Sequence, residues 1–196
     1  NNSLLKNTFL FWLALACSNS VSCQKQVIPG AENTSKYLNL LNGKKVGVVA
    51  HQASLISKTE KKIHLIDALL NKNILVKKVF APEHGFRGTA DAGEKIKNKI
   101  DPQTQLPIIS LYGKNRKPTY EQLLGIDIIV FDLQDVGVRF YTYLSTLHNI
   151  MEACAENNIP LLLLDRPNPN AHYIDGPVLE LEHASFVGMH PVPIVY

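Results

Sequence analysis

Short apolar runs alternate with amphipathic stretches along most of the chain. The runs have the length and composition of buried β-strands and lie at 45–50, 76–80, 106–111, 126–131 and 161–164. Apolar residues recur at helical spacing between them, at 63–70 and at 144–154, where Leu144, Leu147, Ile150, Met151 and Cys154 form one stripe. Ser57 with Glu60, and Thr119 with Gln122, have the spacing of a helix capping box. The pattern therefore predicts strands separated by helices.

Apolar strands that alternate with helices indicate a parallel sheet covered on both faces. The fold class that we predict is α/β, with a Rossmann-like, mostly parallel sheet. Such sheets bind ligands beyond the carboxyl ends of their strands. The polar chemistry follows three of the predicted strands, at 81–88 (APEHGFRG), 132–141 (DLQDVGVRFY) and 165–170 (DRPNPN). We expect these three loops to meet at one edge.

The first loop carries Glu83 between a proline and a histidine, followed by Gly85. A carboxyl group in a partly desolvated loop can have its pKa raised and serve as a general acid. The alternative is a surface turn in which Glu83 only pairs with Arg87.

The second and third loops offer the groups that a sugar site needs: carboxylates, a guanidinium, an amide and an aromatic ring. The alternatives are a structural ion-pair cluster of Asp132, Asp135 and Arg139, and a salt bridge of Asp165 with Arg166 that closes a strand. The candidate sugar-binding residues are Asp132, Gln134, Asp135, Arg139, Tyr141, Asp165 and Asn168.

The N-terminal residues 1–23 have the pattern of an export signal. An apolar run of about ten residues from Thr8 is too short to span a bilayer but has the length of a signal core. Cys17 or Cys23 is then a candidate lipidated cysteine of a bacterial lipoprotein, and secretion without lipidation is the alternative. Residues 24–43 are polar with Pro29-Gly30 and predict a tether and lead-in. We expect an exported protein of the cell envelope, in the periplasm or anchored to a membrane.

Composition excludes several other classes of protein. With 45% hydrophobic and 19% charged residues, the chain is not disordered throughout. A net charge of +3 does not predict nucleic-acid binding. The sequence lacks the dinucleotide fingerprint, the P-loop, the nucleophile elbow and histidine pairs with metal-ligand spacing, so neither a cofactor nor a metal is expected. Cys154, on its apolar stripe, is expected to be a buried thiol.

The loops taken together resemble the exo-β-N-acetylmuramidases of the NamZ type, long known only as a domain of unknown function. The resemblance rests on 81–94, 106–113, 130–143, 164–169 and 185–188, and covers about Lys44 to Tyr196. It implies a bacterial cell-wall glycosidase that releases N-acetylmuramic acid from the non-reducing ends of peptidoglycan fragments. The partners implied are muropeptides or disaccharides derived from peptidoglycan, with no nucleic acid.

By this resemblance, Glu83 is the leading catalytic acid. Asp135 is then the second catalytic candidate, with a water, unless the substrate's own 2-acetamido group takes that role. The substrate-binding residues we expect are His84, Arg87, Asp132, Gln134, Arg139, Tyr141, Asp165 and Asn168.

The same resemblance divides the chain. We expect a Rossmann-like catalytic domain at 44–175 and the start of a truncated C-terminal domain at 176–196, so that the chain lacks half of its cleft. A non-catalytic lipoprotein that binds peptidoglycan fragments is the alternative function, and a nucleotide-using Rossmann enzyme is a third.

Overall fold

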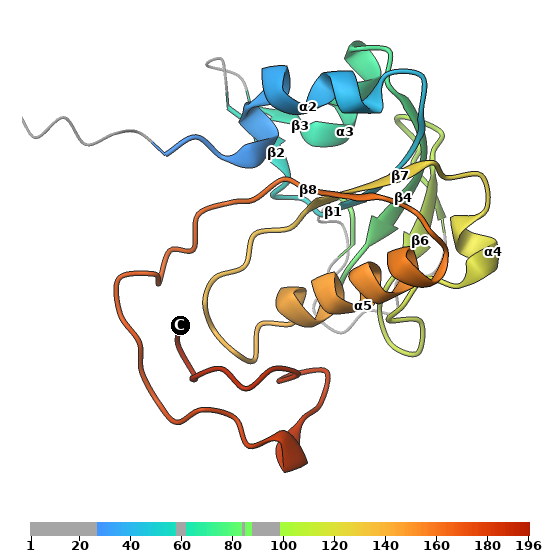
Figure 1. Cartoon of the computed structure of the whole chain (residues 1–196). Helices are drawn as coiled ribbons and strands as arrows, with labels where there is room; N and C mark the ends of the chain where they lie inside the picture. The colour runs from blue at the N-terminus through green and yellow to red at the C-terminus, as the bar shows by residue number, and fades with distance from the viewer. Residues whose placement is uncertain (1–26, 58–61, 84, 88–98) are drawn as a thin grey trace, which may run out of the picture.

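The computed structural model describes residues 27–57, 62–83, 85–87 and 99–196 (Figure 1). Its main feature is a six-stranded sheet in the order β5-β6-β4-β1-β7-β8. The strands are β1 (Lys45–Ala50), β4 (Leu75–Ala81), β5 (Lys99–Ile100), β6 (Pro107–Ser110), β7 (Ile128–Asp132) and β8 (Leu161–Leu163). All neighbours pair in parallel except β5, which is antiparallel to β6. The predicted Rossmann-like α/β fold and its five main strands are confirmed.

Helices cover both faces of this sheet. On one face, α2 (Thr34–Leu41) and α3 (Leu65–Asn71) bury Tyr37, Leu41 and Ile66 against β1 and β4. On the other, α4 (Tyr120–Leu123) and α5 (Tyr143–Glu156) pack over β7 and share a second apolar cluster with it. The two clusters explain why the strand sequences are apolar on both sides.

Glycine is required at the centre of the sheet. A Cβ at Gly47 of β1 would lie 2.6 Å from Cδ1 of Ile129 and 3.1 Å from a ring carbon of Phe80. The absence of a side chain thus lets β4 and β7 pack their large residues over β1.

The capping box predicted at Thr119 is confirmed. The Thr119 hydroxyl accepts from the Gln122 N–H at 3.4 Å, and the Gln122 side-chain oxygen accepts from the Thr119 N–H at 3.0 Å. The box predicted from Ser57 to Glu60 lies in part outside the described residues. The helix expected to include Ile63 begins two residues later, at Leu65, because His64 is its N-cap and accepts from the Ile66 N–H at 3.2 Å.

Several elements were not predicted from the sequence. Ile63 belongs to β3 (Ile63–His64), which pairs with β2 (Leu55–Ile56). Within the expected tether, the 3₁₀-helix η1 (Gly30–Glu32) and α2 pack onto the sheet. Met151, expected on the buried stripe of α5, is 54% exposed.

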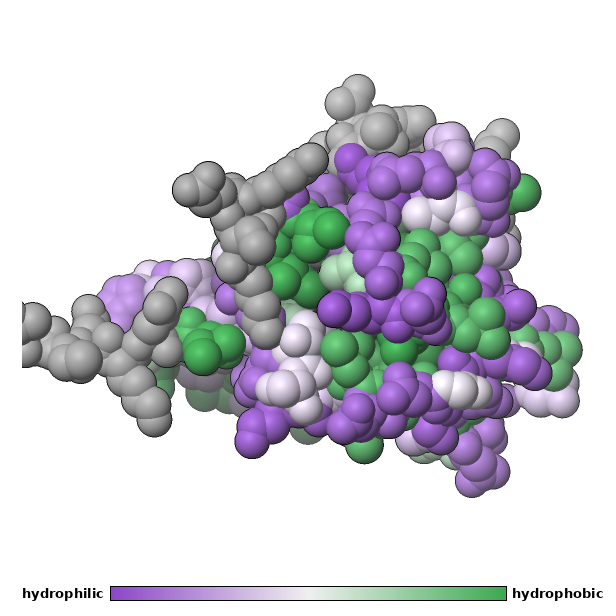
Figure 2. All heavy atoms as spheres, turned by 90° about the horizontal axis from the view of Figure 1, so that it is seen from above, coloured by the Kyte–Doolittle hydropathy of each residue, from purple (hydrophilic) through white to green (hydrophobic). Residues whose placement is uncertain are grey.

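The face of the molecule that carries α2 and α3 mixes apolar and hydrophilic side chains. Figure 2, seen from that side, shows apolar areas interrupted by hydrophilic residues. The exposed apolar side chains on these elements include Leu40 of α2 and Ile63 of β3. No helix among the described residues is long and apolar enough to cross a membrane.

The C-terminal segment, residues 165–196, leaves the sheet after β8 and returns to the loop after β7 (Figure 1). Apart from a short 3₁₀-helix, η2 (Leu181–His183), it contains no helix or strand in the described structure. Val195 forms bridges with Val138 and Asp175, and the Tyr196 N–H donates to the Gly137 carbonyl at 2.9 Å. Backbone hydrogen bonds therefore hold the end of this segment beside the polar loop that follows β7.

Candidate active site at the carboxyl edge of the sheet

The order of the strands reverses at β1. The chain proceeds from β1 to β4 and β6 on one side, and then crosses to β7 and β8 on the other. The carboxyl ends of β1, β4 and β7 therefore surround a topological switch point, where doubly wound sheets bind their ligands. Register pairs Ala50 with Asp132, and Val49 with both Phe80 and Phe131, so the loops at 51–54, 82–87 and 133–142 start side by side.

Glu83 lies in the turn directly after β4 and is half-buried. Gly85 closes this turn with a φ of +76° and donates its N–H to the Pro82 carbonyl at 3.2 Å. Within the described part of the chain, the Glu83 carboxylate takes part in no hydrogen bond or ion pair. It is thus an acidic group at the switch point that the fold does not use for its own stability.

Tyr143 lies near this carboxylate, and Tyr141 packs against Tyr143. Burial raises the pKa of Tyr143, and so do its neighbour Tyr141, which hydrogen-bonds to it, and the negative charge of Glu83. The rings of Tyr141 and Tyr143 meet edge to face, 4.7 Å between centroids, and His51 lies edge-on to Tyr143 at 5.1 Å. The end of β1, the turn after β4 and the start of α5 therefore come together around Glu83.

Asp135 is held by the end of the chain. Its Oδ2 accepts from the Tyr196 hydroxyl at 2.9 Å and from the Gly137 N–H at 3.2 Å. The other carboxylate oxygen, Oδ1, is buried without a hydrogen-bond partner in the described structure. Asn168, from the loop after β8, donates to the Tyr196 carbonyl at 2.6 Å, so Asp135 and Asn168 meet at Tyr196.

Asp132 belongs to a buried ion pair with Arg166. It is fully buried at the end of β7, and its two oxygens accept from Nε and Nη2 of Arg166 at 2.6 and 2.9 Å. This pairing revises two expectations. Asp132 is not at an open site for substrate, and Arg166 bonds to Asp132 rather than to Asp165.

The two arginines predicted to bind substrate also contact protein groups. Arg87 pairs with Asp67 of α3 and Asp101 after β5, each at 3.0 Å. These two carboxylates raise the pKa of Arg87 despite its partial burial. Arg139 donates to the Pro177 and Val192 carbonyls at 2.8 and 3.0 Å. The alternative pairing of Glu83 with Arg87 is therefore wrong, and Arg139 holds the C-terminal segment in place.

The remaining candidates differ in position. Gln134 donates to the Pro167 carbonyl at 2.8 Å and joins the loops after β7 and β8. Asp165 is exposed, and its carbonyl accepts from the Gly30 N–H at 2.6 Å. His84, also predicted to bind substrate, lies outside the described residues, as do Cys17 and Cys23.

Sequence reasoning missed three residues at this edge: His51, Tyr143 and Tyr196. His51 directly follows β1, a position from which a ligand role could have been inferred. A role for Tyr143 could not be inferred because the residue lies at the start of a helix. The contact of Tyr196 with Asp135 could not be inferred because the two residues are distant in sequence.

One group in the described residues could gather ligand atoms around a metal, namely Glu180, Glu182 and His183. All three are exposed and lie in the C-terminal segment.

The fold and the polar edge define a doubly wound α/β domain with an acidic residue and tyrosines at its switch point. Residues 46–196 match the family model described as "Exo-beta-N-acetylmuramidase NamZ, N-terminal", and the chain belongs to this family.

Among its relatives is the peptidoglycan beta-N-acetylmuramidase NamZ of Bacillus subtilis (strain 168), which is 45% identical over 159 residues, 81% of this chain. The chain spans 38% of the length of that relative. Two crystal structures of DUF1343 family proteins from Bacteroides fragilis NCTC 9343 also match, each with a TM-score of 0.74. They are 42% and 40% identical, and the matches cover 87% and 86% of this chain and 43% and 42% of those chains.

Proposed function

We propose that the protein containing this chain is a glycoside hydrolase that releases N-acetylmuramic acid from the non-reducing ends of peptidoglycan fragments. The family and the relative named a peptidoglycan beta-N-acetylmuramidase support this activity. The observation that carries it is the position of Glu83, half-buried at the switch point with no ion pair or hydrogen bond among the described residues.

Glu83 acts as the general acid. It donates its proton to the glycosidic oxygen while the bond to the anomeric carbon breaks, so that the leaving sugar departs as an alcohol. Tyr141 is 36% exposed and its ring packs on the buried ring of Tyr143, so Tyr141 offers the apolar surface and hydroxyl group that sugar sites require.

The positive charge that develops at the anomeric carbon needs a second group. Asp135 with a water and the substrate's own 2-acetamido oxygen are the two candidates. The burial of Asp135 Oδ1, and the two hydrogen bonds to Oδ2, favour the acetamido route, because a carboxylate that activates water needs an accessible oxygen. In this mechanism Asp135 positions the loop after β7.

The substitution Glu83→Gln in the full-length protein tests the proposal, with a chromogenic N-acetylmuramide as substrate. We expect a loss of about 10²–10⁴-fold in kcat, the contribution usual for a general acid. Glu121→Gln, at an exposed carboxylate of α4 outside the predicted substrate-binding residues, is the matched control and should retain activity. Full turnover by Glu83→Gln would remove Glu83 from this role.

NMR of the first anomer formed separates the two routes for the second group. The acetamido route retains the anomeric configuration, whereas direct attack by water inverts it. The alternative function, a lipoprotein that binds peptidoglycan fragments without cleaving them, predicts calorimetric affinity for muropeptides with no release of N-acetylmuramic acid. A lipid anchor at Cys17 or Cys23 and a location in the cell envelope belong to the same proposal, and mass spectrometry of the mature N-terminus tests them.

A further inference from the structure

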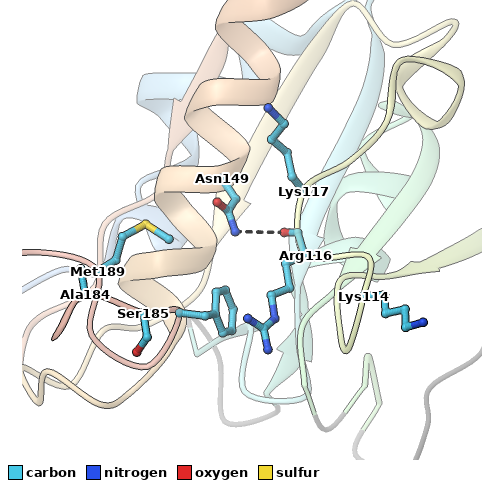
Figure 3. Close-up of a pocket in the computed structure, with 8 residues that line it drawn as sticks. Lys114, Arg116, Lys117, Asn149, Ala184, Ser185 and Met189 are labelled. Atoms are coloured by element: carbon cyan, nitrogen blue, oxygen red, sulfur yellow. Dashed lines mark hydrogen bonds between the residues drawn. The ribbon is translucent and has the colours of Figure 1, made fainter. Parts of the chain in front are cut away.

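A basic hollow of about 560 Å³ lies on one side of α5 (Figure 3). One wall is the loop that joins β6 to α4, a second is α5, and the third is the C-terminal segment. Among the described residues, lysines and an arginine line it and no acidic residue does; the lining includes Arg116, Lys117, Asn149, Ser185 and Phe186.

The hollow has fixed walls. Asn149 of α5 donates from Nδ2 to the Arg116 carbonyl at 3.3 Å, which ties the loop to the helix (Figure 3). Ser185 and Gly188 exchange backbone hydrogen bonds of 2.9 and 3.0 Å, so Phe186 lies within a closed turn. The ring of Phe186 in turn supports the guanidinium of Arg116, whose Cζ lies 4.2 Å from the ring centroid.

Two cations of the lining, Lys114 and Arg116, form no ion pair in the described part of the chain; Lys114 points away from the other lining side chains (Figure 3), so Arg116 is the cation left for a ligand. The Lys117 ammonium is paired with Glu152 and Glu156 at 3.2 and 2.9 Å. Arg116 has no carboxylate within ion-pair distance in the described part of the chain, and its side chain is exposed. A guanidinium is a planar fork of N–H donors whose geometry matches a carboxylate in a bidentate way, and the contact with Phe186 restricts the positions of Arg116.

The hollow is connected to the candidate active site through two of its walls. The β6–α4 loop begins beside the turn of Glu83, because Ser110 pairs with Ala81 and the Leu111 N–H donates to the Ala81 carbonyl at 2.8 Å. Asn149 lies about 9 Å along α5 from Tyr143, at about 1.5 Å per helical residue. Two to three extended peptide residues, at roughly 3.3–3.6 Å each, span that distance.

From this geometry we infer that the hollow around Arg116 binds a carboxylate of the peptide stem carried by a muramic acid residue whose sugar ring lies at Glu83. The identity of this ligand rests on the proposed function. Arg116 forms the ion pair, while Asn149 and Phe186 hold the loop and the guanidinium in place.

Calorimetric titration of the full-length protein carrying Glu83→Gln, so that the ligands are not cleaved, with three disaccharides tests the inference. They are a muramyl disaccharide with an alanyl-glutamate stem, the same disaccharide with its lactyl carboxylate free, and the neutral disaccharide of N-acetylglucosamine. We expect Arg116→Ala to weaken binding of the stem-bearing ligand by about tenfold or more, as loss of a charge-assisted contact does. Arg116→Lys should lose part of that affinity, because it keeps the charge but not the planar fork.

Lys36→Ala is the matched control, since it removes one exposed positive charge from α2 and should leave all three affinities unchanged. Unchanged binding of the stem-bearing ligand by Arg116→Ala would overturn the inference. An equal loss for all three disaccharides, or for the two muramyl ligands alike, would also overturn it. Failure of the wild-type full-length protein to release N-acetylmuramic acid would refute the proposed function instead, since the affinities are measured independently of turnover.

Discussion

The ion pair between Asp132 and Arg166 gives the sharpest prediction about stability. Asp132 is fully buried, and the side chain of Arg166 is 9% exposed. The Arg166 Nη2 also donates to the Leu55 carbonyl at 3.1 Å, so the guanidinium joins β7 to β2. Replacing Asp132 with Asn keeps the shape of the side chain but removes the charge that compensates Arg166.

The expected cost follows from this burial. Removing one partner of a buried pair leaves the other charge without compensation and typically costs about 3–5 kcal/mol. Domains of this kind have unfolding free energies of roughly 5–15 kcal/mol. With a urea m-value of about 1–3 kcal/mol per M, Asp132→Asn should lower the midpoint by about 2 M.

Urea denaturation followed by circular dichroism measures the change. Asp165→Asn is the matched control, because Asp165 is the exposed neighbour of Arg166, and it should change the free energy by about 0.5 kcal/mol or less. In the double variant with Arg166→Met, the cost should be smaller than the sum of the two single costs, since no buried charge then remains unpaired.

Two results would refute this reasoning. The first is an Asp132→Asn midpoint equal to that of the Asp165→Asn control. The second is strict additivity in the double-mutant cycle, which would mean that the two side chains do not act as a pair.

Two further predictions concern pH and backbone conformation. Burial lowers the pKa of His64 from its ordinary value of 6.5, so its contribution to the free energy of unfolding is fully present above pH 6.5 and is lost as the pH falls towards the lower folded-state pKa. In urea titrations at a series of pH values, His64→Asn should make the free energy of unfolding depend less on pH. An unchanged dependence on pH would contradict this prediction. Gly137 has a φ of +65°, and a Cβ there would overlap the side chain of Asn168 and the carbonyl of Tyr196. Gly137→Ala should therefore lower the free energy of unfolding by about 1–3 kcal/mol. The loss should be smaller for Gly43→Ala, where φ is +71° but no heavy atom lies within 4 Å of the added Cβ. Equal losses in the two variants would show that the overlap at Gly137 is relieved without a cost in stability.

The main strands could be predicted from the sequence because a parallel sheet buried on both faces needs nearly continuous apolar runs. The elements that could not be predicted from the sequence are short or depend on residues distant in the chain. β5 has two exposed residues, Lys99 and Ile100, and pairs only with β6. In α2, the sequence offers two buried residues, Tyr37 and Leu41, too few to distinguish a helix from a polar tether.

The position of the candidate site could also be predicted, because the carboxyl edge follows from parallel strands alone. The individual roles could not, since a charged residue in a loop gives no sign of its partner. Arg87 is paired with Asp67 and Asp101, which belong to α3 and to the residues after β5. Arg139 likewise donates its hydrogen bonds to backbone carbonyls of the C-terminal segment.

Burial and hydrogen-bonding capacity therefore separate residues that look alike in the sequence. Three acidic residues, Glu83, Asp132 and Asp135, follow strands at the same edge. Asp132 uses both oxygens on Arg166, and Asp135 uses one on Tyr196 and Gly137 while the other is buried. Glu83 alone among these three keeps its carboxylate free of such bonds in the described structure and faces Tyr143. A proton donor needs that freedom, because a carboxyl group fully engaged by the fold has no geometry left for a substrate oxygen.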